Sequence, residues 1–188
     1  TSHLQKVLFN QKANLSDHLH LAIVKAHQEI FQIGQQNPEY QGMGTTIAVV
    51  YIQGQRAWIA HVGDTRVYLY RDGTLTQLTR DHERTRELLD QGMITQEEYD
   101  HHPDRGVLSK ALGVHEEPPE PSVTEIELHN ADTLMVCSDG GYICQTTERL
   151  QSMLDVQHIL YAARNITDYA REVDGSDNAT VVLARYLE

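Results

Sequence analysis

Several features that mark particular protein classes are scarce in this chain. Its 188 residues include two cysteines, Cys137 and Cys144, and their spacing matches neither a zinc motif nor a disulfide framework. We therefore expect reduced thiols, as in a cytoplasmic protein. No apolar run is long enough to cross a bilayer, and no signal-peptide pattern is present. These absences argue against a disulfide-stapled, zinc-stabilised or membrane-bound protein.

Basic residues are also scarce. There are 15 Lys and Arg against 27 Asp and Glu, which gives a formal net charge of −12. Nucleic acids and anionic membranes attract clustered Lys and Arg, so the charge argues against both partners. The 11 histidines include no His-Glu-x-x-His pattern, and we expect most of them on the surface rather than in a metal site.

The domain organisation is predicted to be simple. The length suits one domain, 1–188, and the chain shows no repeat, low-complexity tract or linker. The first residue is Thr1 rather than methionine, which suggests an excised domain or a processed piece. Helical and strand patterns alternate irregularly along the chain, so we expect an α+β fold.

Periodic patterns predict the elements of this fold. Apolar residues at the helical period indicate a helix from Asn14 to Gly34, and a later one from an Asp155 cap to about Arg171. The first four strands are joined by short turns, so we expect them to form an antiparallel meander. Strands are predicted at 45–52, 56–62, 67–70, 75–79, 123–128, 133–137 and 179–186.

Residues 81–113 form a predicted helical insert between strands. A first helix at 83–91 ends at Gly92, and Thr95-Gln96-Glu97-Glu98 is a capping box that begins a second one. Such an insert is either a mobile lid beside a site or a plain connector, and the sequence leaves both readings open.

Aspartates in three motifs are candidate metal ligands. Ser138-Asp139-Gly140, Gly175-Ser176-Asp177-Asn178 and Gly63-Asp64 each adjoin a predicted strand. Carboxylates held at strand ends suit a hard cation, and oxygen-only ligands select Mg²⁺ or Mn²⁺ over zinc. Gly140 lets backbone or ligand come close to Asp139. Each motif alone is also an ordinary turn sequence; their shared order is the more specific signal.

Six stretches in order resemble one enzyme family, the metal-dependent Ser/Thr protein phosphatases of the PPM type (protein phosphatase 2C) in their bacterial style. They are Gly42-Met43-Gly44-Thr45-Thr46, His61-Val62-Gly63-Asp64-Thr65-Arg66, Leu78-Thr79-Arg80-Asp81-His82, Val107-Leu108-Ser109-Lys110-Ala111-Leu112-Gly113, Val136-Cys137-Ser138-Asp139-Gly140 and Gly175-Ser176-Asp177-Asn178. The resemblance covers nearly the whole chain from Gly42 on. It implies two stacked antiparallel β-sheets flanked by helices, a four-layer αββα sandwich.

The resemblance also implies an activity. Such enzymes hydrolyse phosphoserine and phosphothreonine in proteins, often opposing a cognate Ser/Thr kinase, and use water activated by two Mg²⁺ or Mn²⁺ ions instead of a catalytic side chain. Asp139 and Asp177 would bind one catalytic metal, and Asp64 with Asp139 a third, weaker one. Asn178 would hold the Asp177 loop. Residues 81–113 would be the flap that influences substrate choice.

The chain departs from the family in two places. An Arg that grips phosphate and a Val-Ala-Asp-Gly-Met-Gly-Gly stretch with the metal-bridging Asp would precede Thr1, so we expect a fold incomplete at its N-terminus. Gly141-Tyr142 stands where the family has Leu and then a polar or aromatic residue. The alternatives to a phosphatase are an inactive pseudophosphatase that binds phosphoproteins or a kinase, and a carboxylate-metal hydrolase of another type, which fits the motif order less well.

Overall fold

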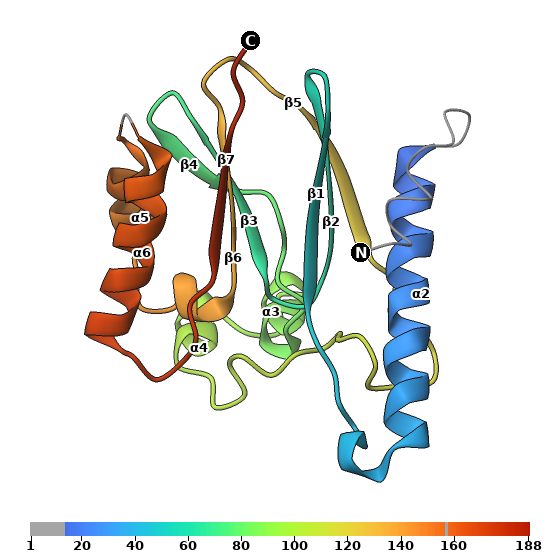
Figure 1. Cartoon of the computed structure of the whole chain (residues 1–188). Coiled ribbons are helices and arrows are strands. Elements are labelled where there is room, and N and C mark those ends of the chain that lie inside the picture. Colours follow the sequence, from blue (N-terminus) through green and yellow to red (C-terminus); the bar gives the residue numbers. More distant parts are fainter. Residues whose placement is uncertain (1–13, 157) are drawn as a thin grey trace. The chain divides into compact units, whose positions relative to one another are not determined.

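A computed structural model describes residues 14–156 and 158–188 (Figure 1). It divides into two compact units. Unit 1 comprises Thr1–Val50, Ala60–Asp64 and Asp81–Thr124, and unit 2 comprises Tyr51–Ile59, Thr65–Arg80 and Glu125–Glu188. The α+β class with two antiparallel sheets is confirmed.

Unit 2 contains a four-stranded antiparallel sheet of order β4-β3-β6-β7. Its strands are β3 (Arg66–Arg71), β4 (Thr74–Gln77), β6 (Thr133–Cys137) and β7 (Val181–Arg185). The predicted turn at Asp72-Gly73 joins β3 to β4, and both of its residues have positive φ, 49° and 77°.

Two helices, α5 (Thr147–Leu154) and α6 (Ile159–Val173), pack on this sheet and are drawn side by side in Figure 1. The core between helices and sheet is apolar and includes the expected core residue Cys137. Its buried members are Tyr68, Tyr70, Leu75, Met135, Cys137, Tyr142, Leu150, Leu154, Ala162 and Ile166. Burial of this apolar surface is the main force that holds the unit together. Cys137 and Cys144 are both free thiols.

The other sheet has the order β1-β2-β5, with β1 (Ile47–Gln53), β2 (Arg56–Val62) and β5 (Ser122–Glu127). The expected four-strand meander is therefore wrong, because β2 and β3 belong to different sheets. Gly63-Asp64 does not close a hairpin but carries the chain from one sheet to the other. The second partner of β3 is β6, with Arg66 opposite Cys137, and no local turn pattern announces a pairing between strands so far apart in sequence.

Unit 1 contains the helix α2 (Leu15–Gln36), the short 3₁₀ turn η1 (Pro38–Tyr40), and the helices α3 (Arg84–Asp90) and α4 (Gln96–Asp100). The Asn14 side chain accepts a hydrogen bond from Ser16 N at 3.2 Å, which confirms the predicted cap. Gly34 lies inside α2 rather than at its end, since the helix continues to Gln36; the position is buried, and a Cβ there would come 3.1 Å from Tyr40 O. The capping box at Thr95 and Glu98 is confirmed.

Two further expectations are corrected. The sequence reading missed α5, and α6 begins after His158 rather than at Asp155, which instead ends α5. Leu150 and Leu154, four residues apart, give the short α5 its buried face. Most histidines of the described residues lie at least partly at the surface, as expected, whereas His27, His61 and His82 are buried, at 1%, 4% and 8% exposure.

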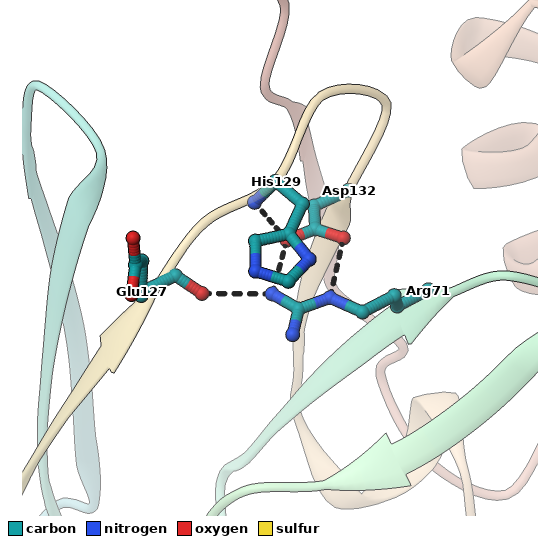
Figure 2. Close-up of polar contacts among 4 residues, drawn as sticks. All are labelled: Arg71, Glu127, His129 and Asp132. Carbon is teal, nitrogen blue, oxygen red and sulfur yellow. Dashed lines mark hydrogen bonds and ion pairs between the residues drawn. The ribbon is translucent and has the colours of Figure 1, made fainter.

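A buried ion pair closes the turn before β6 (Figure 2). Arg71 donates from Nε to Asp132 Oδ1 at 2.9 Å and from Nη2 to Asp132 Oδ2 at 2.6 Å. Arg71 also donates to the carbonyl of Glu127 at 2.7 Å, while the amide of His129 donates to Asp132 at 2.7 Å. The paired hydrogen bonds fix both charges in one geometry, which is the strong form of such a pair.

Within the described ranges, none of the helices has both the length and the apolar character needed to cross a membrane.

Candidate metal centre

The Asp139 motif forms a tight turn at the end of β6. A 3₁₀ turn, η2 (Asp139–Gly141), follows the strand at once. Asp139 Oδ1 accepts a hydrogen bond from Gly140 N at 2.8 Å, and Asp139 O accepts from the amides of Tyr142 at 3.0 Å and Ile143 at 2.9 Å. These bonds orient a half-buried carboxylate with respect to its own turn.

The Asp177 motif precedes β7. Asp177 is exposed, and its Oδ1 accepts a hydrogen bond from Asn178 N at 2.7 Å. This bond gives the Asp177 carboxylate the same local support that Gly140 gives to Asp139. The backbone amide of Asn178 therefore contacts the Asp177 carboxylate, and the role of Asn178 in holding this loop stays a prediction.

The two motifs lie against one another in unit 2. Ser138 Oγ donates to Asn178 O at 3.3 Å and accepts from Thr180 N at 3.1 Å, and Ser138 N donates to Thr180 O at 3.1 Å. A Cβ on Gly140 would lie 2.6 Å from Asn178 O, so only glycine allows this approach. The serine and glycine that flank Asp139 thus join its turn to the Asp177 loop.

This arrangement suits an oxygen-loving divalent cation. It supplies carboxylate oxygens on two loops whose backbones are hydrogen-bonded together, and Mg²⁺ or Mn²⁺ accepts such donors. Among residues 14–156 and 158–188, no group of three or more His, Cys, Asp or Glu side chains is placed to hold a metal. The ligand roles of Asp139 and Asp177 therefore stay predictions that rest on the joined loops.

Arg66 and Tyr142 form a contact beside the Asp139 turn that the sequence reading did not single out. The Arg66 guanidinium carbon lies 3.6 Å from the centroid of the Tyr142 ring, and Arg66 Nη1 donates to Tyr68 Oη at 3.0 Å. In the sequence, Arg66 is marked only by its place after Gly63-Asp64-Thr65, and Tyr142 only by its difference from the family pattern. Their proximity depends on the pairing of β3 with β6.

The remaining motifs gather in unit 1. Thr45 and Leu112 exchange backbone hydrogen bonds, at 3.1 Å from Thr45 N and 2.8 Å from Leu112 N. Gly63, with φ of +103°, packs so closely on Thr46 that a Cβ would lie 2.3 Å from Thr46 Cγ2. Three stretches that are distant in sequence therefore meet within this unit.

His82 braces the loop that carries Asp64. Gly63 N donates to His82 Nδ1 at 3.1 Å, and His82 N donates back to Gly63 O at 3.0 Å. Because Nδ1 accepts, the ring proton is on Nε2, which lies 3.0 Å from Ser122 Oγ. The ring stacks on His61 with centroids 4.7 Å apart.

The environment of His82 keeps it neutral. Burial, then the nearby His61 and Lys110, lowers the pKa of His82 from 6.5 to about 4. The sequence signal for His82 is weak, since its only mark is its place at the end of the Leu78–His82 stretch. Asp64 itself is half-buried in unit 1, and its predicted sharing of a metal with Asp139 stays a prediction.

The insert at 81–113 is tied together around one buried tyrosine. Tyr99 donates from its hydroxyl to Glu83 at 3.3 Å, and the guanidinium carbons of Arg86 and Arg105 lie 6.0 and 5.4 Å from its ring centroid. Burial, together with Glu83 and Asp81, raises the pKa of the Tyr99 hydroxyl. The role of this segment as a flap stays a prediction.

Comparison with known proteins places the chain in a family. The family model "Protein phosphatase 2C" matches residues 1–88. The Streptococcus pyogenes protein named "Putative protein phosphatase 2C-type" is 32% identical over 179 residues, which cover 95% of this chain and 72% of that protein. The chain belongs to the protein phosphatase 2C family.

Other members extend this result. The serine/threonine protein phosphatase PstP of Mycobacterium tuberculosis is 37% identical over 154 residues, 82% of this chain. That match spans only 30% of the length of PstP. The crystal structure of the M. tuberculosis phosphatase PstP/Ppp superposes with a TM-score of 0.90 and 32% identity, and covers 100% of this chain and 79% of that one. A structure of the PstP catalytic domain in complex with 2 manganese ions has a TM-score of 0.84 and 30% identity, and covers 100% of this chain and 80% of that one.

Proposed function

We propose that the protein from which this chain comes is a metal-dependent Ser/Thr protein phosphatase. The observation that carries the proposal is the junction of the Asp139 turn with the Asp177 loop, through Ser138, Gly140 and Asn178, in a chain of the protein phosphatase 2C family. The manganese-bound PstP catalytic domain, 30% identical, supports the metal dependence.

In this proposal Asp139 and Asp177 hold a divalent cation, Mg²⁺ or Mn²⁺, and Asp64 contributes to a further, weaker site. A divalent cation lowers the pKa of a bound water towards neutrality and offsets negative charge on phosphoryl oxygens. The chain's own contribution is to hold the carboxylates still. The amides of Gly140 and Asn178 do so by each donating to one carboxylate oxygen, which leaves the other oxygen to face a ligand.

The substrates are phosphoserine and phosphothreonine side chains of proteins. The named relatives are Ser/Thr phosphatases, and this supports the substrate class for the present chain. A cognate Ser/Thr kinase is the partner that such an activity would oppose.

Hydrolysis of p-nitrophenyl phosphate and of a phosphothreonine peptide, titrated with Mn²⁺, tests the proposal. We expect the protein from which this chain comes to show Mn²⁺-dependent turnover that is lost in Asp139→Asn and kept in Asp168→Asn, which removes an exposed carboxylate of α6 instead. Turnover that persists in Asp139→Asn would overturn the site assignment. Phosphopeptide binding without turnover in that unaltered protein would favour the pseudophosphatase.

A further inference from the structure

The contact between Arg66 and Tyr142 connects β3 to the turn that carries Asp139. Arg66 lies opposite Cys137, the last residue of β6, and Tyr142 is the residue at which η2 ends. Their separation of 3.6 Å, from guanidinium carbon to ring centroid, places the cation directly over the ring face. The contact therefore connects the residue that follows the turn, Tyr142, with the strand position opposite the residue at the end of β6.

The ring of Tyr142 is fixed on its other side by the core of unit 2. It is only 6% exposed and belongs to the same cluster as Cys137, Leu150 and Ile166. Gly141 has no side chain to contribute to this support, and a Cβ there would lie tightly, at 3.1 Å, against Cys137 Cβ. Tyr142 is thus the first large side chain after Asp139.

The turn is held by short-range hydrogen bonds. Gly141 N donates to Ser138 O at 2.9 Å, the amides of Tyr142 and Ile143 donate to Asp139 O, and Gln145 Nε2 donates to Gly141 O at 2.8 Å. A turn of three residues is nevertheless too short to be stable in isolation. Packing from outside must therefore add to these bonds, and to those between Ser138 and the Asp177 loop, to fix the direction of the Asp139 carboxylate.

We propose that Arg66 and Tyr142 are positioning residues that hold the η2 turn, and so orient Asp139 for a divalent cation. The orientation of the turn is a property of the metal-free chain; only its use for a metal rests on the proposed function. Neither residue touches substrate in this role.

The first test is amide hydrogen exchange of the metal-free chain, measured by NMR. Arg66→Gln and Tyr142→Leu are expected to speed exchange at Gly141, Tyr142 and Ile143 roughly three- to tenfold, because the turn loses its outer support. The amide of Met135, in the centre of the sheet, is the reference for global opening. Tyr142→Phe keeps the ring and is expected to stay near the unaltered rate.

The matched control is a second stacked pair in the same unit. The Arg149 guanidinium carbon lies 4.4 Å from the Tyr169 ring centroid, on α5 and α6. Tyr169→Leu makes the same chemical change away from η2, so exchange at the three turn amides should not change. Unaltered turn exchange in both Arg66→Gln and Tyr142→Leu would overturn the proposal.

The second test measures binding of Mn²⁺ alone by titration calorimetry. Arg66→Gln and Tyr142→Leu should each weaken binding roughly three- to tenfold, and the double variant little more than either single one, because the two side chains act as one unit. Arg66→Lys should bind Mn²⁺ more weakly than the unaltered chain but more tightly than Arg66→Gln, since an ammonium keeps the charge but lacks the planar stacking of guanidinium. Additive losses would contradict a shared role.

The two tests also separate this inference from the proposed function. If the unaltered chain binds no Mn²⁺ but the variants still speed turn exchange, the positioning role holds and the metal assignment fails. If Mn²⁺ binding weakens while turn exchange stays constant, Arg66 and Tyr142 act on the metal by another route and the positioning role is wrong.

Discussion

A Cβ atom on Gly140 would lie 2.6 Å from the carbonyl oxygen of Asn178, closer than carbon and oxygen atoms pack in proteins. This contact shows why the residue after Asp139 is glycine. Any side chain there would push the Asp177 loop away from the end of β6, and the backbone atoms on the far side cannot rotate out of the way as a side chain would.

Gly140→Ala is therefore expected to separate the two aspartate loops. We predict a loss of about 1–3 kcal/mol in unfolding free energy, typical of overpacking, together with weaker Mn²⁺ binding, measured by urea denaturation and calorimetry. Gly141→Ala is the comparison and should cost less, because a Cβ there would lie 3.1 Å from Cys137 Cβ, which is a tight contact but longer than the 2.6 Å at Gly140. Equal stability of Gly140→Ala and the unaltered chain would contradict the contact.

Gly113 and Gly106 form a second matched pair, since both have φ of +81°. A Cβ on Gly113 would meet Ile30 Cγ2 at 2.2 Å, whereas nothing lies within 4 Å of one on Gly106. Gly106→Ala should cost about 1–2 kcal/mol for the left-handed backbone alone. Gly113→Ala should cost about 1–3 kcal/mol more for overpacking against α2. Equal losses in thermal or urea unfolding would show that α2 does not pack on Gly113 in solution.

The ion pair in Figure 2 should matter for stability far more than surface pairs. The Asp132 side chain is 1% exposed and that of Arg71 is 30% exposed, so Asp132→Ala removes the carboxylate but leaves Arg71 partly solvated and bonded to the Glu127 carbonyl. We expect a loss of about 1–3 kcal/mol in unfolding free energy, measured by urea denaturation. Asp168→Ala, which breaks exposed pairs on α6 with Arg164 and Arg171, should cost about 0.5 kcal/mol or less.

The same carboxylate predicts an acid effect. Burial raises the pKa of Asp132, but the hydrogen bonds from Arg71 and the His129 amide together outweigh it and hold the pKa below 3.8. As the pH falls, Asp132 is therefore protonated in the unfolded chain before it is protonated in the folded chain. The stability that Asp132 contributes is present above about pH 4 and is lost as the pH falls through the lower native value. Asp132→Asn should remove this part of the acid sensitivity.

His82 should make stability depend on pH in a higher range. Its pKa is about 4 in the native chain against 6.5 ordinarily, so the unfolded chain binds the extra proton between these values. Stability should be full above pH 6.5 and decline as the pH falls towards 4. In chemical denaturation at stepped pH, His82→Gln should flatten this decline, while His115→Gln, at an exposed position, should not. If the pH dependence of the unfolding free energy is unchanged in His82→Gln, the pKa of His82 is not lowered in the folded chain.

Local pattern gave much of the secondary structure. The predicted bounds of β2 and β6 match the structure, because each is a short run of apolar and β-branched residues between clear turn signals. The start of α6 was misplaced because Asp155, a common capping residue, ends α5 instead of beginning α6. Thr146 before Leu150 and Leu154 was the available signal for α5, since its side chain caps the helix at Arg149 N.

Local sequence patterns could not predict which strands pair when they lie far apart in the sequence. The separation of β2 from β3 depends on β6, a strand beyond the whole 81–113 insert, and no local period encodes that choice. The aspartates of the candidate metal site could be proposed from the sequence, because each belongs to a motif of neighbouring residues. Arg66 with Tyr142, and His61 with His82, were not found as pairs, because each contact exists only after the chain has folded.

In the sheet of order β4-β3-β6-β7, β3 pairs with β6, which lies far along the chain, so the sheet cannot be completed until late in synthesis. A growing chain releases β3 and β4 long before β6, and the Asp177 loop becomes available only with β7. The two aspartate loops therefore meet last, when the final strand closes the sheet. The Asp139 turn and the Asp177 loop can come together only after β7 has been synthesised, so the capacity to hold a cation arrives with the last strand of this sheet.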